Sequence, residues 1–164
     1  MKKIIIALLV IIILGVGYWL VSPIFINHRV SESLPLAPTQ VTPPDGQNSA
    51  VQSSGTQVIA TGSFHDVLAG HHAKGVANLL KINSAYYIRF EDDFEITNGP
   101  DLVVYLGKDN HYDPAAKIAG LKGNIGSQNY EIPSVIDVSQ YDEVWIWCRS
   151  FSVPFGAASL QRKS

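Results

Sequence analysis

The hydrophobic positions of this chain follow two patterns, one continuous run near the N-terminus and many short runs in the C-terminal two thirds. The run Ile4–Val21 contains 18 residues without a charged or amide side chain. As a helix it would extend roughly 27 Å, close to the thickness of the hydrocarbon core of a bilayer. The apolar character continues to Ile26, and Tyr18 and Trp19 suit the membrane interface. We therefore predict a transmembrane helix or signal anchor over residues 4–26.

The charges that flank this run favour one orientation. Lys2 and Lys3 precede it, whereas Arg29 alone lies close on the other side. Positive residues stay in the cytoplasm, so we predict a cytoplasmic tail over 1–3 and a single-pass cell-membrane protein whose C-terminal domain lies outside. A cleavable signal peptide is the alternative, but the run exceeds the usual ~7–15 apolar residues and lacks a clean A-x-A site.

Residues 27–55 have a different composition. They carry four prolines with scattered Ser, Thr and Gln, and their few apolar residues follow neither a period of 2 nor a period of 3.6. Such a segment has little to bury, so we predict a disordered Pro/Ser-rich linker. As a flexible tether it would reach roughly 30 Å, which would let the outer domain sample partners near the membrane.

From residue 56 to residue 164 the pattern predicts an all-β domain. Short apolar runs alternate with Gly, Pro, Asn and Asp, and Asn83-Ser84 separates two of them as a hairpin turn would. Asn98, Gly99, Pro100 and Asp101 form a second, structural turn, because Gly supplies a positive φ and Pro fixes its own. We expect a β-sandwich-like fold or an open barrel, with only 113–119 as a candidate short helix. The expected strands are 56–60, 75–82, 85–90, 94–96, 102–106, 129–132, 141–151 and 156–160.

Composition narrows the function. The chain is 46% hydrophobic and 16% charged, and 12 basic against 14 acidic residues leave a net charge of −2. That charge gives no basic footprint, so a nucleic acid is an unsuitable partner. No GxSxG, P-loop, GxGxxG or HExxH motif is present. The sequence thus offers no catalytic constellation, and the domain is at most a redox carrier rather than an independent enzyme.

Cys148 is the one cysteine of the chain. A single thiol excludes an intrachain disulfide and a zinc site of the CxxC…CxxC type. Because alternate residues of a strand share a face, Cys148 is expected to lie with Val144, Ile146 and Ser150. Two interpretations stay open, a buried small hydrophobe and a redox thiol or cofactor ligand. The opposite face is expected to carry Trp145, Trp147, Arg149 and Phe151.

Two further groups of side chains have the chemistry of ligands. His65, His71 and His72 lie within eight residues, which makes them candidate cofactor ligands for copper or haem, although surface histidines are the plainer interpretation. The initiator methionine is the only one, so no thioether is available as an axial ligand. Oxygen ligands for a hard cation are offered by acidic side chains, but their spacing fits no EF-hand loop. These side chains are Glu91, Asp92, Asp93, Glu95 and Asp101.

Three long strings resemble the electron-transfer DM-thirteen domain family over about residues 62–160. They are GSFHDVLAGHHAKGVANL, RFEDDFEITNGPDLVVYL and IPSVIDVSQYDEVWIWCRSFSVPFGAASL. The resemblance implies a small β-sandwich-like module that is secreted or membrane-tethered and that, in animals, accompanies cytochrome b-type electron-transfer domains. The near-invariant cysteine of the family corresponds to Cys148, with a proposed role as a free thiol or as the holder of a haem-like group. Its histidine four residues before a glycine best matches His71, and His72 is the alternative.

Two functions therefore compete. The first is a membrane-anchored, extracytoplasmic redox or electron-transfer module that uses Cys148, with a haem-like group as its candidate cofactor and an envelope redox protein as its partner. The second is a non-enzymatic binding or adhesion module at the cell envelope, in which the cysteine only packs. The burial of Cys148 and the position of the histidines relative to it discriminate between them.

Overall fold

The computed structural model describes the outer domain and two shorter parts of the chain before it. The described residues are 3–4, 10–12, 15, 17, 26–35 and 55–163. Most of the predicted membrane span 4–26, and residues 36–54 of the predicted linker, lie outside them. Within the described residues, no helix is long and apolar enough to cross a membrane.

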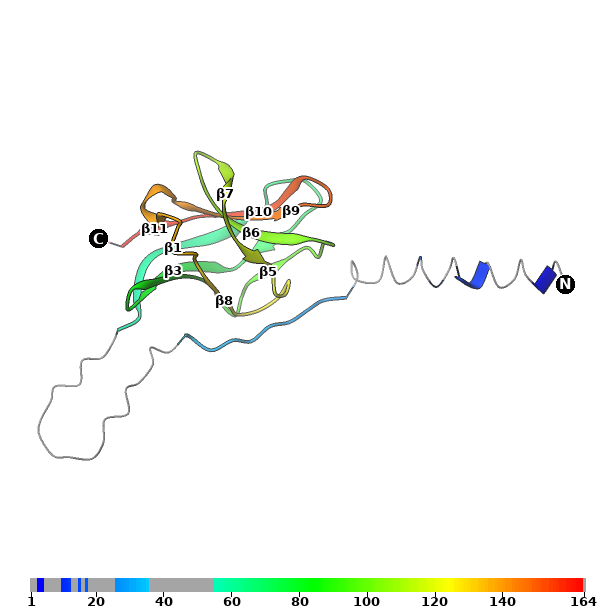
Figure 1. Cartoon of the computed structure of the whole chain (residues 1–164), viewed down its shortest axis with the longest axis horizontal. Coiled ribbons are helices and arrows are strands. Elements are labelled where there is room, and N and C mark those ends of the chain that lie inside the picture. Colours follow the sequence, from blue (N-terminus) through cyan, green and yellow to red (C-terminus); the bar gives the residue numbers. More distant parts are fainter. Residues whose placement is uncertain are drawn as a thin grey trace, which may run out of the picture.

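The described residues form an all-β domain, as the sequence predicts (Figure 1). A single short 3-10 helix, η1 (Val138–Gln140), interrupts the strands between residues 55 and 163. The strands are β1 (Gln57–His65), β2 (Ala73–Lys74), β3 (Val76–Ile82), β4 (Ala85–Phe90), β5 (Glu95–Ile96), β6 (Leu102–Lys108), β7 (His111–Gly120), β8 (Gln128–Glu131), β9 (Glu143–Cys148), β10 (Val153–Ser159) and β11 (Gln161–Arg162).

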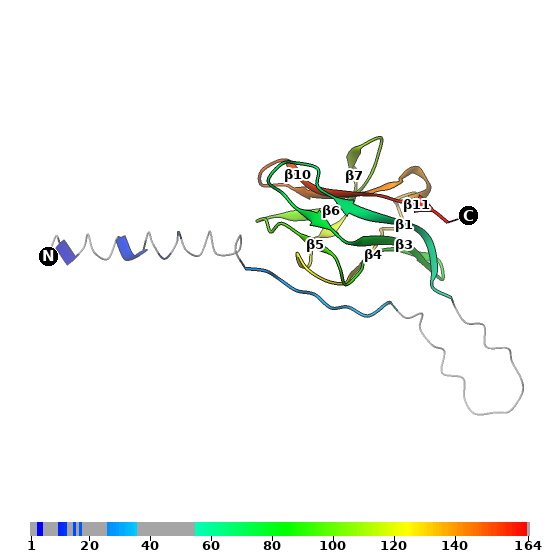
Figure 2. The same ribbon diagram turned by 180° about the vertical axis from the view of Figure 1, so that it is seen from behind.

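Nine of the strands form one large sheet, and β2 and β5 pair in a separate two-stranded sheet. The strand order of the large sheet is β7-β6-β9-β10-β1-β3-β4-β8, and β11 pairs with β1. The sheet curls so that its two ends approach each other (Figure 2). There the Lys122 backbone N–H, just after β7, donates to the Tyr130 hydroxyl of β8 at 2.9 Å, and Lys122 Nζ donates to the Asn129 carbonyl at 2.7 Å. The expected sandwich is therefore a nearly closed barrel, and closure removes most of the exposed strand edge.

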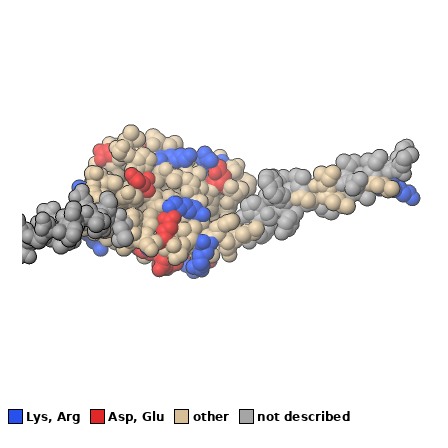
Figure 3. Space-filling view, turned by 60° about the horizontal axis from the view of Figure 1, so that its bottom comes forward, with Lys and Arg blue, Asp and Glu red and all other residues tan. Residues whose placement is uncertain are grey.

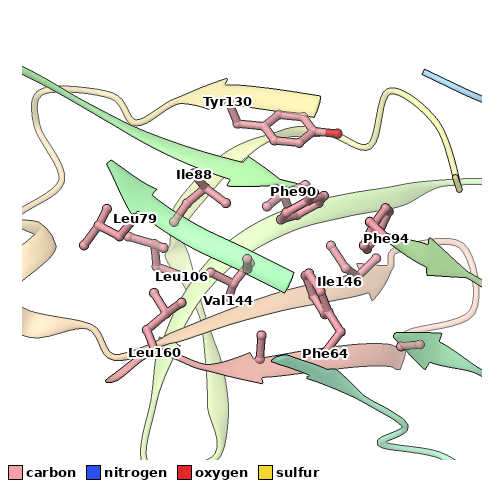
Figure 4. Packing of buried hydrophobic residues seen from close by; sticks show 14 of the residues in the cluster. Phe64, Leu79, Ile88, Phe90, Phe94, Leu106, Tyr130, Val144, Ile146 and Leu160 are labelled. Atoms are coloured by element: carbon pink, nitrogen blue, oxygen red, sulfur yellow. The ribbon is translucent and has the colours of Figure 1, made fainter. Parts of the chain in front are cut away.

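The interior of the barrel holds an apolar core (Figure 4). Phe64 of β1 and Phe90 of β4 meet edge to face with ring centroids 4.9 Å apart, and Phe94 packs on both rings. Phe90 and Phe94 have no exposed surface. Aromatic side chains of this size supply a large share of the hydrophobic stabilisation of a small domain.

Three local expectations change. The candidate helix 113–119 is wrong, because these residues belong to strand β7, which pairs with β6, a strand buried from Leu102 to Gly107. β7 lies at one end of the strand order, and Pro114 is tolerated in such an end strand. The predicted strand 141–151 is shorter, since β9 ends at Cys148 and the chain turns before β10 with Ser152 at φ 54°. The first strand is longer than 56–60 and continues through Gly62 to His65.

The beginning of the predicted linker is also different from expectation. Residues 26–35, which we call the strap, lie against the barrel, and Arg29 forms a parallel bridge with Ile125. In Figure 1 the strap is the blue trace that passes below the domain. The strap binds the barrel through backbone and polar side-chain hydrogen bonds. Because such bonds require no regular pattern of apolar residues, the sequence does not reveal this contact.

Candidate functional site

Cys148 ends strand β9 in the wall of the barrel. Its Cα partners are Leu102 on β6 and Val153 on β10, so strands cover it on both sides. The side chain has no exposed surface and belongs to the main core cluster together with Val144 and Ile146. The alternation predicted for this strand is confirmed for these three residues. Ser150 lies beyond the end of β9 and is exposed.

The other face of the same strand carries an aromatic cluster on the outside of the barrel. Trp145 and Tyr105 are buried there, and Trp147 and Tyr112 are half-buried. The rings of Tyr112 and Trp147 stack at 4.2 Å with an interplanar angle of 26°, and Tyr112 meets Tyr105 edge to face at 5.1 Å. We call these four side chains the outer aromatic cluster. They lie between the solvent and the outer face of the sheet, and Cys148 lies on the inner face of the same sheet.

Polar groups at the border of this cluster orient its rings. Glu143 is buried, and its carboxylate accepts hydrogen bonds from Trp145 Nε1 at 2.7 Å and from the Asn110 backbone N–H at 3.0 Å. Burial raises the pKa of the Tyr105 hydroxyl above its ordinary value, against the smaller, opposing effect of the Arg149 charge. Tyr105 is therefore a neutral phenol at physiological pH.

The three candidate histidines occupy different environments. His65 is exposed at the end of β1, and His72 is exposed with its Nδ1 3.4 Å from an Asp66 carboxylate oxygen. His71 stacks on the Phe155 ring with centroids 3.9 Å apart, and its buried Nδ1 has no hydrogen-bond partner among the described residues. The described part of the chain contains no group of three His, Cys, Asp or Glu side chains arranged to hold a metal ion.

A haem-like group does not fit Cys148 in this arrangement. A ligand bond requires the iron to reach the sulfur, and a side chain with no exposed surface leaves no room for a macrocycle beside it. None of the three histidines joins it in a ligand group among the described residues. We therefore derive no chemistry through a haem.

The acidic side chains are mostly engaged with partners of their own. Glu91 accepts from Asn78 Nδ2 at 2.7 Å and from Arg89 Nε at 2.9 Å. Glu95 pairs with Lys74 at 2.9 Å, and one Asp93 oxygen accepts the Val76 N–H. Figure 3 shows acidic and basic side chains interspersed on the face it views, without a large patch of one sign.

The predicted turn 98–101 connects β5 to β6. Asn98 Oδ1 accepts the Gly99 N–H at 3.0 Å, and Asn98 Nδ2 donates to the Ile26 carbonyl at 2.6 Å. Both Asp101 carboxylate oxygens accept from the Arg149 guanidinium, at 2.9 and 3.0 Å. This ion pair joins the turn to the end of the strand that carries Cys148.

Sequence reasoning missed the outer aromatic cluster as a unit, although it placed Trp145 and Trp147 on one face. Their partners Tyr105 and Tyr112 come from β6 and β7, and β7 was expected to be partly helical. Sequence reasoning also missed the strap, for which composition carries no signal.

Comparison with protein-family models gives one match, to the electron transfer DM13 family, over residues 64–160. No curated protein and no solved structure matches the chain. The matched residues run from β1 to the residue after β10 and include Cys148, all four members of the outer aromatic cluster and the 98–101 turn. They are more than half of the chain, which therefore belongs to the electron transfer DM13 family.

Proposed function

We propose that this chain is a membrane-anchored, extracytoplasmic one-electron carrier in which the Cys148 thiol is the redox group. Membership of an electron-transfer family supports a redox role. The observation that carries the finer proposal is the position of Cys148, fully buried in a sheet whose outer surface bears stacked, half-buried aromatic rings. Electrons cross such a wall without any reactant touching the sulfur.

The burial of Cys148 limits the reactions that its thiol can undergo. Nucleophilic attack, disulfide exchange and oxidation to a sulfenic acid all need a reagent to contact the sulfur. A side chain with no exposed surface does not allow that contact. One-electron oxidation needs no reagent beside the sulfur: the thiol gives one electron to an oxidised partner through the wall, and its proton passes to a water molecule that enters during a brief opening of the barrel, leaving a thiyl radical. The reverse step takes back one electron and one proton.

The outer aromatic cluster is the path for the electron. Trp147 precedes Cys148 in β9, projects to the outer face and stacks on Tyr112, which is itself half-buried. A one-electron oxidant in an envelope partner, strong enough to oxidise an indole or phenol ring, would withdraw an electron from this pair. Cys148 then reduces the oxidised ring by transferring one electron to it, over the short covalent and non-covalent path between the two faces of β9.

A photo-oxidation experiment tests this function. The full chain in lipid nanodiscs is mixed with a ruthenium tris-bipyridine photo-oxidant and an electron acceptor, and the visible absorbance of the indole radical is followed after a flash. We expect the radical to decay by oxidation of Cys148, more slowly in D₂O than in H₂O. In Cys148→Ala the radical should persist several times longer. Equal decay in the two proteins contradicts the role of the cysteine.

The anchoring has its own support in the apolar run 4–26, which lies largely outside the described residues. A protease added to intact cells should digest the β domain, while a tag attached before Met1 should stay protected. Protection of the domain instead would reverse the proposed orientation and place its partner in the cytoplasm.

A second candidate function is a binding module at the envelope with a structural cysteine. It is favoured by the same burial of Cys148 and by the half-buried Tyr112–Trp147 pair, since exposed aromatic surface is common at recognition sites. Enrichment of one envelope protein or glycan on the full chain, lost in Trp147→Ala and retained in Cys148→Ala, would favour this function.

A further inference from the structure

The strap is attached to the barrel as an additional strand segment. The Val30 N–H donates to the Ile125 carbonyl at 2.9 Å, the Ile125 N–H donates to the His28 carbonyl at 3.3 Å, and the Glu32 N–H donates to the Ser127 carbonyl at 3.0 Å. These reciprocal bonds add the strap to residues 123–127, which precede β8 and which we call the edge segment. Peptides that bind proteins by strand addition are held in this way.

Two glycines of the edge segment admit the strap. A Cβ atom at Gly123 would collide with the His28 carbonyl oxygen, and one at Gly126 would collide with the Val30 carbonyl oxygen. Gly126 also has φ +94°, a conformation that residues with a side chain rarely adopt. The edge is therefore shaped for a backbone lying close against it.

Polar side chains fix the position of the strap along the edge. The Glu32 carboxylate accepts from Lys122 Nζ at 2.7 and 3.0 Å and from the Asn129 backbone N–H at 2.8 Å. Buried Asn124 accepts from the His28 N–H at 2.7 Å and donates to Asn27 at 2.9 Å. Burial raises the pKa of Glu32, but its bonds to Lys122 and Asn129 more than offset that effect and lower it.

The strap begins where the apolar run ends. Among the described residues of the strap, the first contact is made by the carbonyl of Ile26, which accepts from Asn98 in the 98–101 turn, and Ile26 is also the last residue of the predicted span. No free residue separates the two. Because the strap is already seated on the barrel, the connection between the predicted span and the domain does not run through residues 36–54.

We propose that the strap clamps the domain directly onto a lipid surface, with the end that carries the 98–101 turn facing the bilayer. The inference rests on the membrane anchoring proposed above. The proposal identifies which end of the domain faces the membrane, because β11 lies at the end of the domain opposite the start of the strap (Figures 1 and 2). The outer domain holds one orientation at the membrane instead of sampling the reach of a tether.

Cleavage of the chain between the strap and β1 distinguishes a clamp from a flexible tether. A recognition sequence for a site-specific protease is inserted between Gln47 and Asn48 of the full chain, which is reconstituted in phosphatidylcholine vesicles and cleaved. We expect most of the severed β domain to float with the vesicles, because the strap holds it. Release of the domain on cleavage overturns the proposal.

Two variants and a second cut position complete the experiment. Gly126→Val, which blocks the seat of Val30, should release the domain after cleavage, and Glu32→Gln should release it partly. Glu131→Gln, on β8 but outside the strap contacts, is the matched control and should retain it. Cleavage at a recognition sequence inserted between Ile26 and Asn27, directly after the predicted span, should free strap and domain together. Retention after that cut would mean that the domain binds lipid by itself, which overturns the clamp.

The same chain reports on orientation. Cys148 is buried, so a fluorophore attached to Pro100→Cys or to Lys163→Cys labels one chosen site. Lipids with a nitroxide headgroup should quench the label at position 100 strongly and the label at position 163 weakly. Equal quenching overturns the proposed orientation.

Failure of anchoring is distinguishable from failure of the clamp. If the uncleaved chain does not float, the membrane anchor of the proposed function is wrong. The clamp is then read from gel filtration of the cleaved chain in detergent, in which the N-terminal fragment should co-elute with the domain. Separate elution of the two fragments overturns the clamp. The readouts involve no redox chemistry, so they do not depend on the role of Cys148.

Discussion

The core around Cys148 and the strap are attached to the same barrel by opposite kinds of interaction. Cys148 lies among apolar side chains in a region without exposed surface, where packing decides stability. The strap contributes few buried apolar atoms and is held by hydrogen bonds and one ion pair with Lys122. The comparison teaches that the candidate redox group is kept in place by burial, whereas the attachment of the strap depends on polar contacts that water competes for.

The largest effect is expected in the core. Phe90→Ala removes a side chain with no exposed surface that contacts Phe64, Phe94 and Tyr130. The lost transfer free energy and the cavity should lower the free energy of unfolding by about 3–5 kcal/mol, measured by urea denaturation. Tyr112→Ala, in the half-buried outer cluster, is the matched control. A cost for Phe90→Ala no greater than that of the control would show that the interior is not the main source of stability.

Cys148→Ser should have the next largest effect. It places a hydroxyl in an apolar environment without a designed partner, at a cost of about 1–3 kcal/mol in the free energy of unfolding. Cys148→Ala should cost less, because it leaves no unpaired polar group. A thiol reagent should modify native Cys148 only as fast as the domain opens. Rapid modification of the folded protein would contradict the burial of the sulfur.

Asn124→Ala sharpens the other side of the comparison. It removes the acceptor of the His28 N–H and the donor to Asn27, so the strap should open more readily by about 1–2 kcal/mol. Hydrogen exchange at the Val30 and Glu32 amides should accelerate, while exchange in β9 should change little. Equal acceleration at both places would mean that strap and barrel open together as one unit.

The smallest expected effect is a loosening of the strap in acid. Because the pKa of Glu32 is lowered in the folded chain, its contribution is present above the ordinary carboxyl pKa and is lost as pH falls through the folded value. Exchange at the Glu32 amide, corrected for the intrinsic pH dependence, should therefore rise at low pH. Glu32→Gln should abolish that rise. A rise of the same size in the variant would assign it to other carboxylates.

The sequence could predict the barrel strands that have a clear pattern. Asn83-Ser84 is the hairpin turn between β3 and β4, and the apolar run at 102–106 is a buried strand. The alternation around Cys148 correctly assigned Val144 and Ile146 to its face. The prediction of a short helix at 113–119 failed, because pairing with β6 outweighs the local preference of a short segment.

The candidate site could be predicted only in part. The family strings identified Cys148, and the family is confirmed over residues 64–160. The partners of the two tryptophans could not be predicted, since Tyr105 and Tyr112 join them through strand order rather than spacing along the chain. The histidines are close in sequence, but stacking of His71 on Phe155 and the contact between the His72 imidazole and the Asp66 carboxylate place His71 and His72 in different surroundings.

By itself, the sequence determined the all-β class, the family and the face of β9 to which Cys148 belongs, because alternation and turn residues are local properties of the chain. Only the tertiary structure decided that the sheet nearly closes, that the sulfur has no exposed surface and that the strap lies on the barrel. These features depend on contacts between distant residues such as His28 and Asn124, which no local pattern records.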